Sequence, residues 1–187
     1  MTPNDNLVPI IASARELYGR VVYTHITHEK EREIWSAKVC RMNNINIWLA
    51  GATTFFAIIS ASLQPAWGTV VTAIFAAATI AFVMWQSNLD PAGREAQHRV
   101  AAKELLWIRE QLLLLITDRH ISPGSSDHAQ KCLEVLTREL TTVYKFAPNT
   151  SPQAYAAAEK SIKSGHFTFS NEEIDGMLPV DLRKTQS

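Results

Sequence analysis

The stretch that decides the fold is residues 42–89, MNNINIWLAGATTFFAIISASLQPAWGTVVTAIFAAATIAFVMWQSNL. None of these forty-eight residues is Asp, Glu, Lys, Arg or His. Two apolar runs of nineteen residues, 45–63 and 69–87, flank a turn-like segment at 64–68. As a helix, each run would rise roughly 28 Å, which matches the hydrocarbon core of a bilayer. The stretch therefore predicts a transmembrane hairpin.

A soluble alternative is a helical hairpin buried in a large core. A chain of 187 residues leaves too little other sequence to wrap two helices that are apolar on nearly every face. The tryptophans also favour a membrane, because Trp48 and Trp85 fall near the ends that lead to the chain termini, while Trp67 lies in the turn. Aromatic side chains gather in this way at the two water interfaces of a bilayer.

The charges that flank the hairpin predict its orientation. Segment 64–68 carries no charge, whereas both outer flanks are basic. The basic residues are Lys30, Arg32, Lys38 and Arg41 on one side and Arg94, Arg99 and Lys103 on the other. By the positive-inside rule, we expect both termini in the cytoplasm and the turn on the far side of the membrane.

Polar and small side chains follow one face of each apolar run, since they recur in steps of three and four. The polar members of these stripes are Asn46, Thr53, Ser60, Gln64, Thr69, Thr72, Thr79 and Gln86. Two interpretations stay open. Small and hydroxyl residues let membrane helices approach closely and hydrogen-bond each other. The same groups could instead line a water-filled lumen in an oligomer.

The rest of the sequence predicts an all-α membrane protein in which a cytosolic helical bundle carries the two-helix transmembrane hairpin. Residues 1–41 have the composition of one long helix that runs into the first span, and residues 90–146 predict a helical hairpin after a stop at 90–93. Apolar positions recur in four-three steps from Ala101 to Leu115 and from Ala129 to Val143, so these helices should pack together with the N-terminal one. Residues 147–187 predict two short helices, one from Pro152 and one capped near residues 170–173, and a tail.

One face of the N-terminal helix is strongly polar. His25, His28, Glu29 and Arg32 lie at spacings of three, four and seven, which place them on the same side. Two histidines and a carboxylate can ligate a metal. A polar contact with a neighbouring helix or subunit explains the same pattern, and we favour it, so no metal site is predicted.

Composition and motifs exclude several function classes. The formal net charge is zero, from 18 basic and 18 acidic residues, so no global basic surface predicts nucleic-acid binding. The two cysteines, Cys40 and Cys132, predict neither a disulfide framework nor a zinc site. The sequence has no phosphate-binding glycine loop, no catalytic triad pattern and no ionisable residue in either span. We expect a protein that is not an enzyme, uses no cofactor and acts on the lipid bilayer.

The sequence also resembles a known family. Leu17-Tyr18-Gly19-Arg20, the segment from Tyr23 to Glu29, two adjacent spans, a helical hairpin and IDGMLPVDLR at 174–183 are similar to SLATT domains. These are two-transmembrane effector domains associated with SMODS nucleotidyltransferases and SLOG sensors in bacterial conflict systems. The resemblance implies an antiviral, oligomeric pore in the bacterial inner membrane that depolarises or kills the infected cell.

The resemblance further implies control by a nucleotide signal or a sensor protein. The residues that could contact a phosphate and stack on a base are Arg15, Tyr18, Arg20, Tyr23 and His25. An ordinary role on the helix surface and in the bundle also explains them, and we favour that role. A second function class also stays open, namely a membrane-anchored interaction or scaffold module, in which the hairpin only tethers the bundle.

Overall fold

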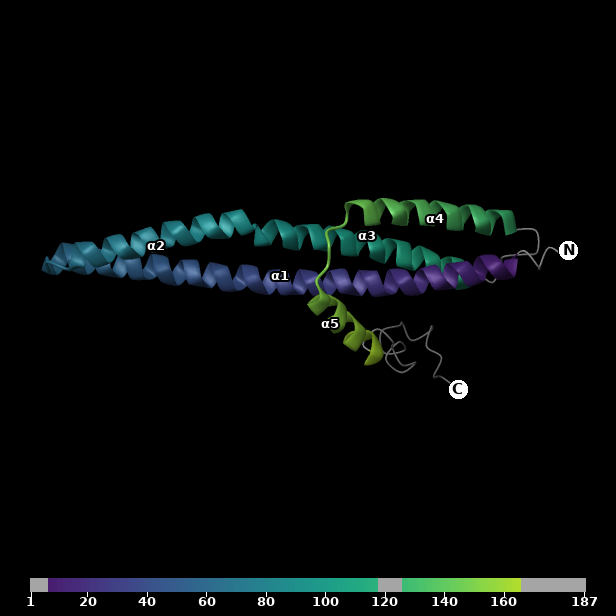
Figure 1. Cartoon of the computed structure of the whole chain (residues 1–187), viewed down its shortest axis with the longest axis horizontal. Coiled ribbons are helices and arrows are strands. Elements are labelled where there is room, and N and C mark those ends of the chain that lie inside the picture. Colours follow the sequence, from purple (N-terminus) through teal and green to yellow (C-terminus); the bar gives the residue numbers. More distant parts are fainter. Residues whose placement is uncertain (1–6, 118–125, 166–187) are drawn as a thin grey trace, which may run out of the picture.

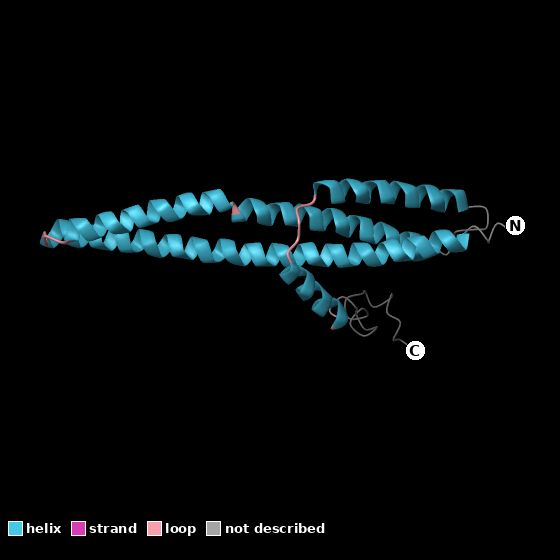
Figure 2. Ribbon diagram, viewed as in Figure 1, coloured by secondary structure: helices cyan, strands magenta, loops and turns pink. Residues whose placement is uncertain are grey.

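The computed structural model describes residues 7–117 and 126–165, which form five helices (Figures 1 and 2). They are α1 (Leu7–Leu63), α2 (Gly68–Leu89), α3 (Pro91–Thr117), α4 (Ser126–Phe146) and α5 (Pro152–Lys163). Residues 118–125, within the predicted helical hairpin at 90–146, and the segments predicted near 170–173 and in the tail lie outside the described residues.

Helix α1 is one uninterrupted helix of 57 residues. At 1.5 Å per residue it is about 85 Å long. Its only proline, Pro9, falls in the first turn, where a missing N–H costs the helix no hydrogen bond. The prediction that the N-terminal helix continues into the first apolar run is confirmed.

A tight turn connects α1 to α2. Gln64 adopts a left-handed backbone with φ of 47°, and the N–H of Gly68 donates to the carbonyl of Pro65 at 2.9 Å. Gly68 is buried, and a Cβ on it would approach Ser60 Cβ to 3.0 Å and the Pro65 ring to 3.1 Å. The glycine therefore allows α2 to begin in close contact with α1.

The junction between α2 and α3 is a single residue. Asp90 has φ of 44° and ψ of 57°, and its N–H donates to the carbonyl of Gln86 at 3.1 Å. The sequence predicted a longer break and a helix from Arg94, and that boundary is wrong because Pro91 already starts α3. Proline suits the first helical position, and the Asp90 carboxylate accepts from the N–H of Gly93 at 3.0 Å.

Three helices form the bundle. Helix α3 runs antiparallel to α1, and α4 packs along both (Figure 1). The core consists of Val21, Leu105, Ile108, Leu112, Leu136 and Leu140, with Leu17, Tyr18, Leu115, Leu133 and Val143 packed against it. The members from α3 and α4 form the apolar seams that the four-three spacing predicted, and Val21, Leu17 and Tyr18 come from α1. The predicted packing of the three helices is confirmed.

Helix α5 lies against α1 on the side opposite α4 (Figure 1). Ser151 caps it, because its hydroxyl accepts from the N–H of Ala154 at 3.2 Å, and Pro152 occupies the first turn, as predicted. Ala154 and Ala158 are fully buried. Small side chains at this i,i+4 spacing let α5 approach α1 closely.

The second half of α1 and all of α2 project beyond the bundle as a long arm (Figure 2). We call residues 42–63 of α1 together with α2 the hairpin arm. In the most apolar windows of its two helices, 0% and 6% of the residues are buried. A core helix of a soluble protein would be covered, so this exposure agrees with two spans that face lipid.

Candidate functional site: the hairpin arm and its polar junction with the bundle

Amide side chains join the two helices of the hairpin arm at the end nearer the bundle. Asn46 Nδ2 donates to Gln86 Oε1 at 2.5 Å, and Gln86 Nε2 donates to Asn43 Oδ1 at 3.3 Å. Asn46 Oδ1 is buried and has no hydrogen-bond partner among the described residues. Because these bonds join side chains of two different helices, the cluster fixes the register of α1 against α2.

The hydroxyl groups of the half-buried threonines in the arm form hydrogen bonds within their own helix. Thr53, Thr72 and Thr79 each donate to the carbonyl four residues earlier, at 2.8, 2.9 and 2.8 Å respectively. The methyl groups of these threonines remain available for close packing. This arrangement allows a hydroxyl residue in an apolar environment without an unpaired donor.

Aromatic stacking closes the arm near its turn. The Phe56 and Phe75 rings stack with centroids 5.3 Å apart, and Trp67 meets Phe56 edge-on at 6.4 Å. Together with the contact between Ser60 and Gly68, these rings hold the far end of the two helices together.

Six of the eight polar residues predicted as a stripe lie on the inner face of the arm, defined as the positions that α1 and α2 partly cover on each other. They are Asn46, Thr53, Ser60, Thr72, Thr79 and Gln86, all half-buried. Gln64 and Thr69 are exposed at the turn. Within one chain, the two stripes therefore meet each other. The outer face of α2 carries Ala73, Ala77 and Ala81 instead.

A buried polar junction lies where the arm meets the bundle. His28 and His98 are each 3% exposed, and their Nδ1 atoms are 3.0 Å apart. At this distance one ring must donate its Nδ1 proton while the other accepts it, so the pair holds a single shared proton between the two nitrogens. Burial, with His98 next in effect, lowers the pKa of His28 to about 4 from 6.5.

His25 lies one helical turn before His28 and is also buried, at 8% exposure. Its Nδ1 has no hydrogen-bond partner among the described residues. Burial and the nearby Arg109 lower the pKa of His25, although Glu29 and Glu110 oppose the shift. A neutral imidazole is therefore the stable form at this position.

Charged residues surround the histidines. Glu95 of α3 is buried and accepts from Arg99 Nη2 at 2.7 Å, while Arg32 Nη1 of α1 lies 3.8 Å from the same carboxylate. Arg32 Nε also donates to Glu29 at 2.9 Å. The polar face predicted on the N-terminal helix thus contacts a neighbouring helix, and that helix is α3.

Glu31 fastens α5 to α1. Its carboxylate accepts from Trp35 Nε1 at 3.0 Å, from the Ser151 N–H at 2.9 Å and from the Ser151 hydroxyl at 2.6 Å. Burial alone would raise the pKa of Glu31, but the hydrogen bonds from Ser151 and Trp35 and the nearby His98 together lower the pKa below its usual value. The charged form is the one that holds α5.

The family model described as SMODS and SLOG-associating 2TM effector domain family 4 matches residues 11–173. The chain belongs to this family. No curated protein and no solved structure matches the chain. Membership of the SLATT family, together with two helices long and apolar enough to cross a membrane, indicates a membrane protein.

In this SLATT domain, the residues predicted to contact a nucleotide do not gather into one site. Arg15 is exposed, and Arg20 is exposed and pairs with Glu16. Tyr18 packs on the bundle core, and the Tyr23 ring stacks on Tyr155 at 6.0 Å. Within the described ranges, no three His, Cys, Asp or Glu side chains cluster in a way that could hold a metal ion.

Sequence reasoning missed the α3 half of the junction. His98 and Glu95 continue the buried seam of α3, in steps of three, from Ala101 toward the membrane. Extending the apolar pattern backwards would have found two polar residues at core positions. Such residues need partners, and the polar face of the N-terminal helix supplies them.

Proposed function

We propose that the protein is a pore-forming membrane effector of a bacterial conflict system, which assembles into a homo-oligomer and depolarises the inner membrane during phage infection. The observation that carries the proposal is the hairpin arm. It has two charge-free apolar helices with uncovered surfaces, and it belongs to a chain of a two-transmembrane effector family. Its action would be permeation, without a catalytic step or a cofactor.

Assembly follows from geometry, since one hairpin of two helices cannot enclose a lumen. Ala73, Ala77 and Ala81 form an outward stripe at four-residue spacing on α2, and small residues at this spacing allow membrane helices to pack closely. In the bundle, Val100, Trp107 and Leu114 are spaced by seven residues and are 61%, 57% and 61% exposed. Apolar surface of this extent supports contact with further copies.

Topology is the first test of the proposal. The charge-free turn and the basic flanks support a cytoplasmic bundle with the turn in the periplasm. Reporters fused after Ser187 and after Asn6 should both behave as cytoplasmic, and a tag inserted at 64–68 should reach the periplasm. A terminus found outside the cell membrane would contradict the hairpin topology.

The trigger we propose is a nucleotide signal or a neighbouring sensor protein acting on the cytoplasmic bundle. The decisive measurement is membrane potential in cells that express the protein with its natural neighbouring genes. We expect depolarisation on infection in the wild type. A wild-type protein that never changes the membrane potential under these conditions would contradict the proposed pore function.

Inner-face variants test where ions pass. Thr53→Leu and Ser60→Leu should be compared with Ile58→Leu, which changes an exposed side chain of the same span. Both membrane potential and oligomer mass are measured on each variant. Loss of depolarisation with assembly retained places the inner face along the lumen, whereas loss of both places it in a packing seam.

A membrane-anchored scaffold is the second candidate. It is favoured by the pairing of Asn46 with Gln86 inside one chain, because a tether needs no lumen. A scaffold would recruit its partner proteins normally without any change in membrane potential, so the same cells distinguish the two functions.

A further inference from the structure

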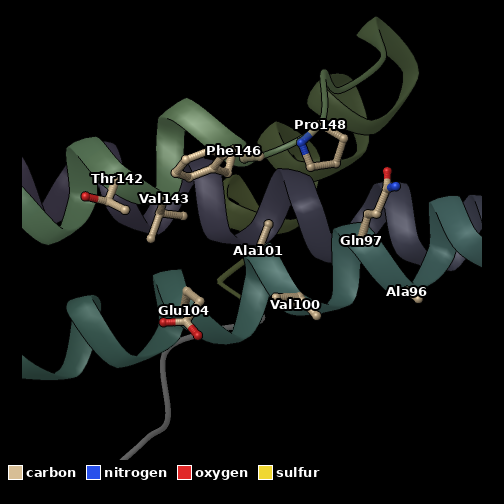
Figure 3. A pocket seen from close by; sticks show the side chains of 10 residues that line it. Ala96, Gln97, Val100, Ala101, Glu104, Thr142, Val143, Phe146 and Pro148 are labelled. Atoms are coloured by element: carbon tan, nitrogen blue, oxygen red, sulfur yellow. The ribbon is translucent and has the colours of Figure 1, made fainter.

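The bundle has an apolar groove between α3 and α4. It has a volume of about 480 Å³ and is lined by Ala96, Gln97, Val100, Ala101, Glu104, Thr142, Val143, Phe146, Ala147 and Pro148. Figure 3 shows Val143 and Phe146 above Val100 and Ala101, on the two facing helices. Phe146 is 76% exposed. In a single chain, this groove leaves apolar side chains open to water.

We propose that this groove receives α5 of a second copy of the chain, so that the bundles join head to tail into a ring. The inference rests on the proposed oligomeric function and names its contact surface. In a ring of this type each copy offers two different surfaces, one to each neighbour. The groove and α5 meet that requirement, because α4 and α5 lie on opposite sides of α1 (Figure 1).

The two surfaces lie at the same depth from the membrane. Copies related by rotation about the membrane normal keep every residue at a constant depth, so only level surfaces can meet. Tyr155 of α5 stacks on Tyr23 at 6.0 Å. The next residue, Thr24, has its hydroxyl 3.4 Å from that of Tyr144, which adjoins Val143 in the groove. Tyr155, which is half exposed, and the groove therefore share one level.

The charged residues of α5 and of the groove are also complementary, and they lie on the same side of the apolar contact. Helix α5 runs away from the arm from its first residue, Pro152 (Figure 1). Lys160, which is exposed, therefore lies farther from the arm than Tyr155. Glu139 lies one helical turn before Val143, again farther from the arm, and Glu104 borders the groove on α3. None of these three charges has an ion-pair partner among the described residues. Tyr155 would fill the apolar groove near the arm, and Lys160 would pair with Glu139 or Glu104 farther from it. The two surfaces are therefore complementary in shape and in charge.

Paired cysteines test the contact in membranes from cells that also express the neighbouring genes. In a background of Cys40→Ser and Cys132→Ser, the double variant Val100→Cys with Tyr155→Cys is treated with a short bismaleimide. We expect a ladder of covalent oligomers from the double variant and none from either single variant. A covalent dimer from Val100→Cys alone would mean that two grooves face each other, and it would overturn the proposal.

Oligomer mass separates failure of this contact from failure of the proposed function. A double variant that forms oligomers of wild-type mass without any cross-link places the interface elsewhere and overturns the ring contact, while the pore stands. A protein that stays monomeric in the presence of its neighbouring genes overturns both. Far-ultraviolet circular dichroism of each variant verifies that the helices are intact.

Charge reversal provides an independent check. Lys160→Glu should weaken assembly by about fivefold, as expected for one exposed ion pair replaced by repulsion. Adding Glu139→Lys should restore assembly. The control is Lys131→Glu, an exposed lysine near the other end of α4, which should leave assembly unchanged. Failure of the second change to rescue the first would contradict the pairing.

Discussion

The hairpin arm and the bundle sort their side chains in opposite ways, although α1 passes through both. The bundle covers Leu105 and Leu112 completely and exposes most of its charged residues, such as Lys103 and Arg138. The arm partly covers Asn46 and Gln86 and exposes isoleucines, with Ile80 at 62%. In water, burial of apolar surface stabilises the fold, whereas in lipid the pairing of polar groups stabilises it. The solvent around each half therefore decides which side chains its helices turn toward each other.

The largest effect expected from this contrast is on a core leucine. Leu112→Ala should reduce the free energy of unfolding by about 2–5 kcal/mol, because it leaves a cavity in the bundle core. The matched variant Ile80→Ala removes an exposed side chain of the arm and should cost less than about 1 kcal/mol in lipid. Thermal unfolding in lipid nanodiscs measures both. Equal losses would show that the arm also has a core of apolar side chains.

The next effect concerns the buried carboxylate that holds α5. Glu31→Ala should reduce stability by about 2–3 kcal/mol, because it leaves the Trp35 indole and both donors of Ser151 without an acceptor. Amide hydrogen exchange in α5 should increase at the same time. Glu33→Ala, on the exposed side of the same helix, is the control, and increased exchange in α5 of that variant would argue against a specific role of Glu31.

Lowering the pH should destabilise the polar junction around His28 and His98 but leave the hairpin arm unchanged. The pKa of His28 is lowered to about 4, and those of His25 and His98 are also lowered. A depressed histidine pKa means that the unfolded chain binds protons more readily. The free energy of unfolding is therefore highest above pH 6.5, and it decreases by on the order of 2 kcal/mol as the pH drops toward 4.

The charged groups that act on this histidine pair are Glu31 from α1 and Arg94 from α3, and the ion pair of Arg32 with Glu95 joins the same two helices. The His98→Asn variant should show a flatter dependence of unfolding on pH, and His128→Asn, an exposed histidine of α4, should keep the wild-type dependence. An unchanged slope in His98→Asn would remove the histidine pair as the cause.

The smallest effect expected is on the amide pairing in the arm. Gln86→Leu should cost about 1 kcal/mol, the usual value of a hydrogen bond between membrane helices. Ser87→Leu changes the adjacent exposed position and should cost less. Thermal unfolding in nanodiscs compares the two, and a Gln86→Leu variant as stable as the wild type would show that packing alone holds α1 against α2.

Periodicity predicted most of the fold, because both halves follow strong and simple patterns. The absence of charge over residues 42–89 indicates the hairpin, and the four-three spacing from Ala101 to Leu115 indicates the bundle seam. The direction in which the polar stripes face could not be predicted, since a lumen and a packing seam require the same residues at the same spacing. Only the placement of α2 beside α1 puts Thr53 and Thr72 on the shared inner face.

Other features depend on contacts between distant segments. The sequence predicted α5 as a short helix, but nothing in its pattern identifies Glu31, 120 residues away, as the acceptor for Ser151. The predicted start of α3 was wrong because Pro91 and Gly93 are typical turn residues. In this chain Pro91 starts the helix, and the N–H of Gly93 donates to the Asp90 carboxylate.

The unbroken length of α1 has a mechanical consequence. A helix of about 85 Å without an internal proline beyond its first turn behaves as a stiff lever, while its antiparallel companions meet at the one-residue joint of Asp90. If such a lever pivots near its middle, a tilt of about five degrees displaces either end by roughly 4 Å, given the rise of a helix. A small push on the bundle would therefore move the far end of the arm by almost the width of one side chain, and Asp90 is where α2 and α3 would bend to follow it.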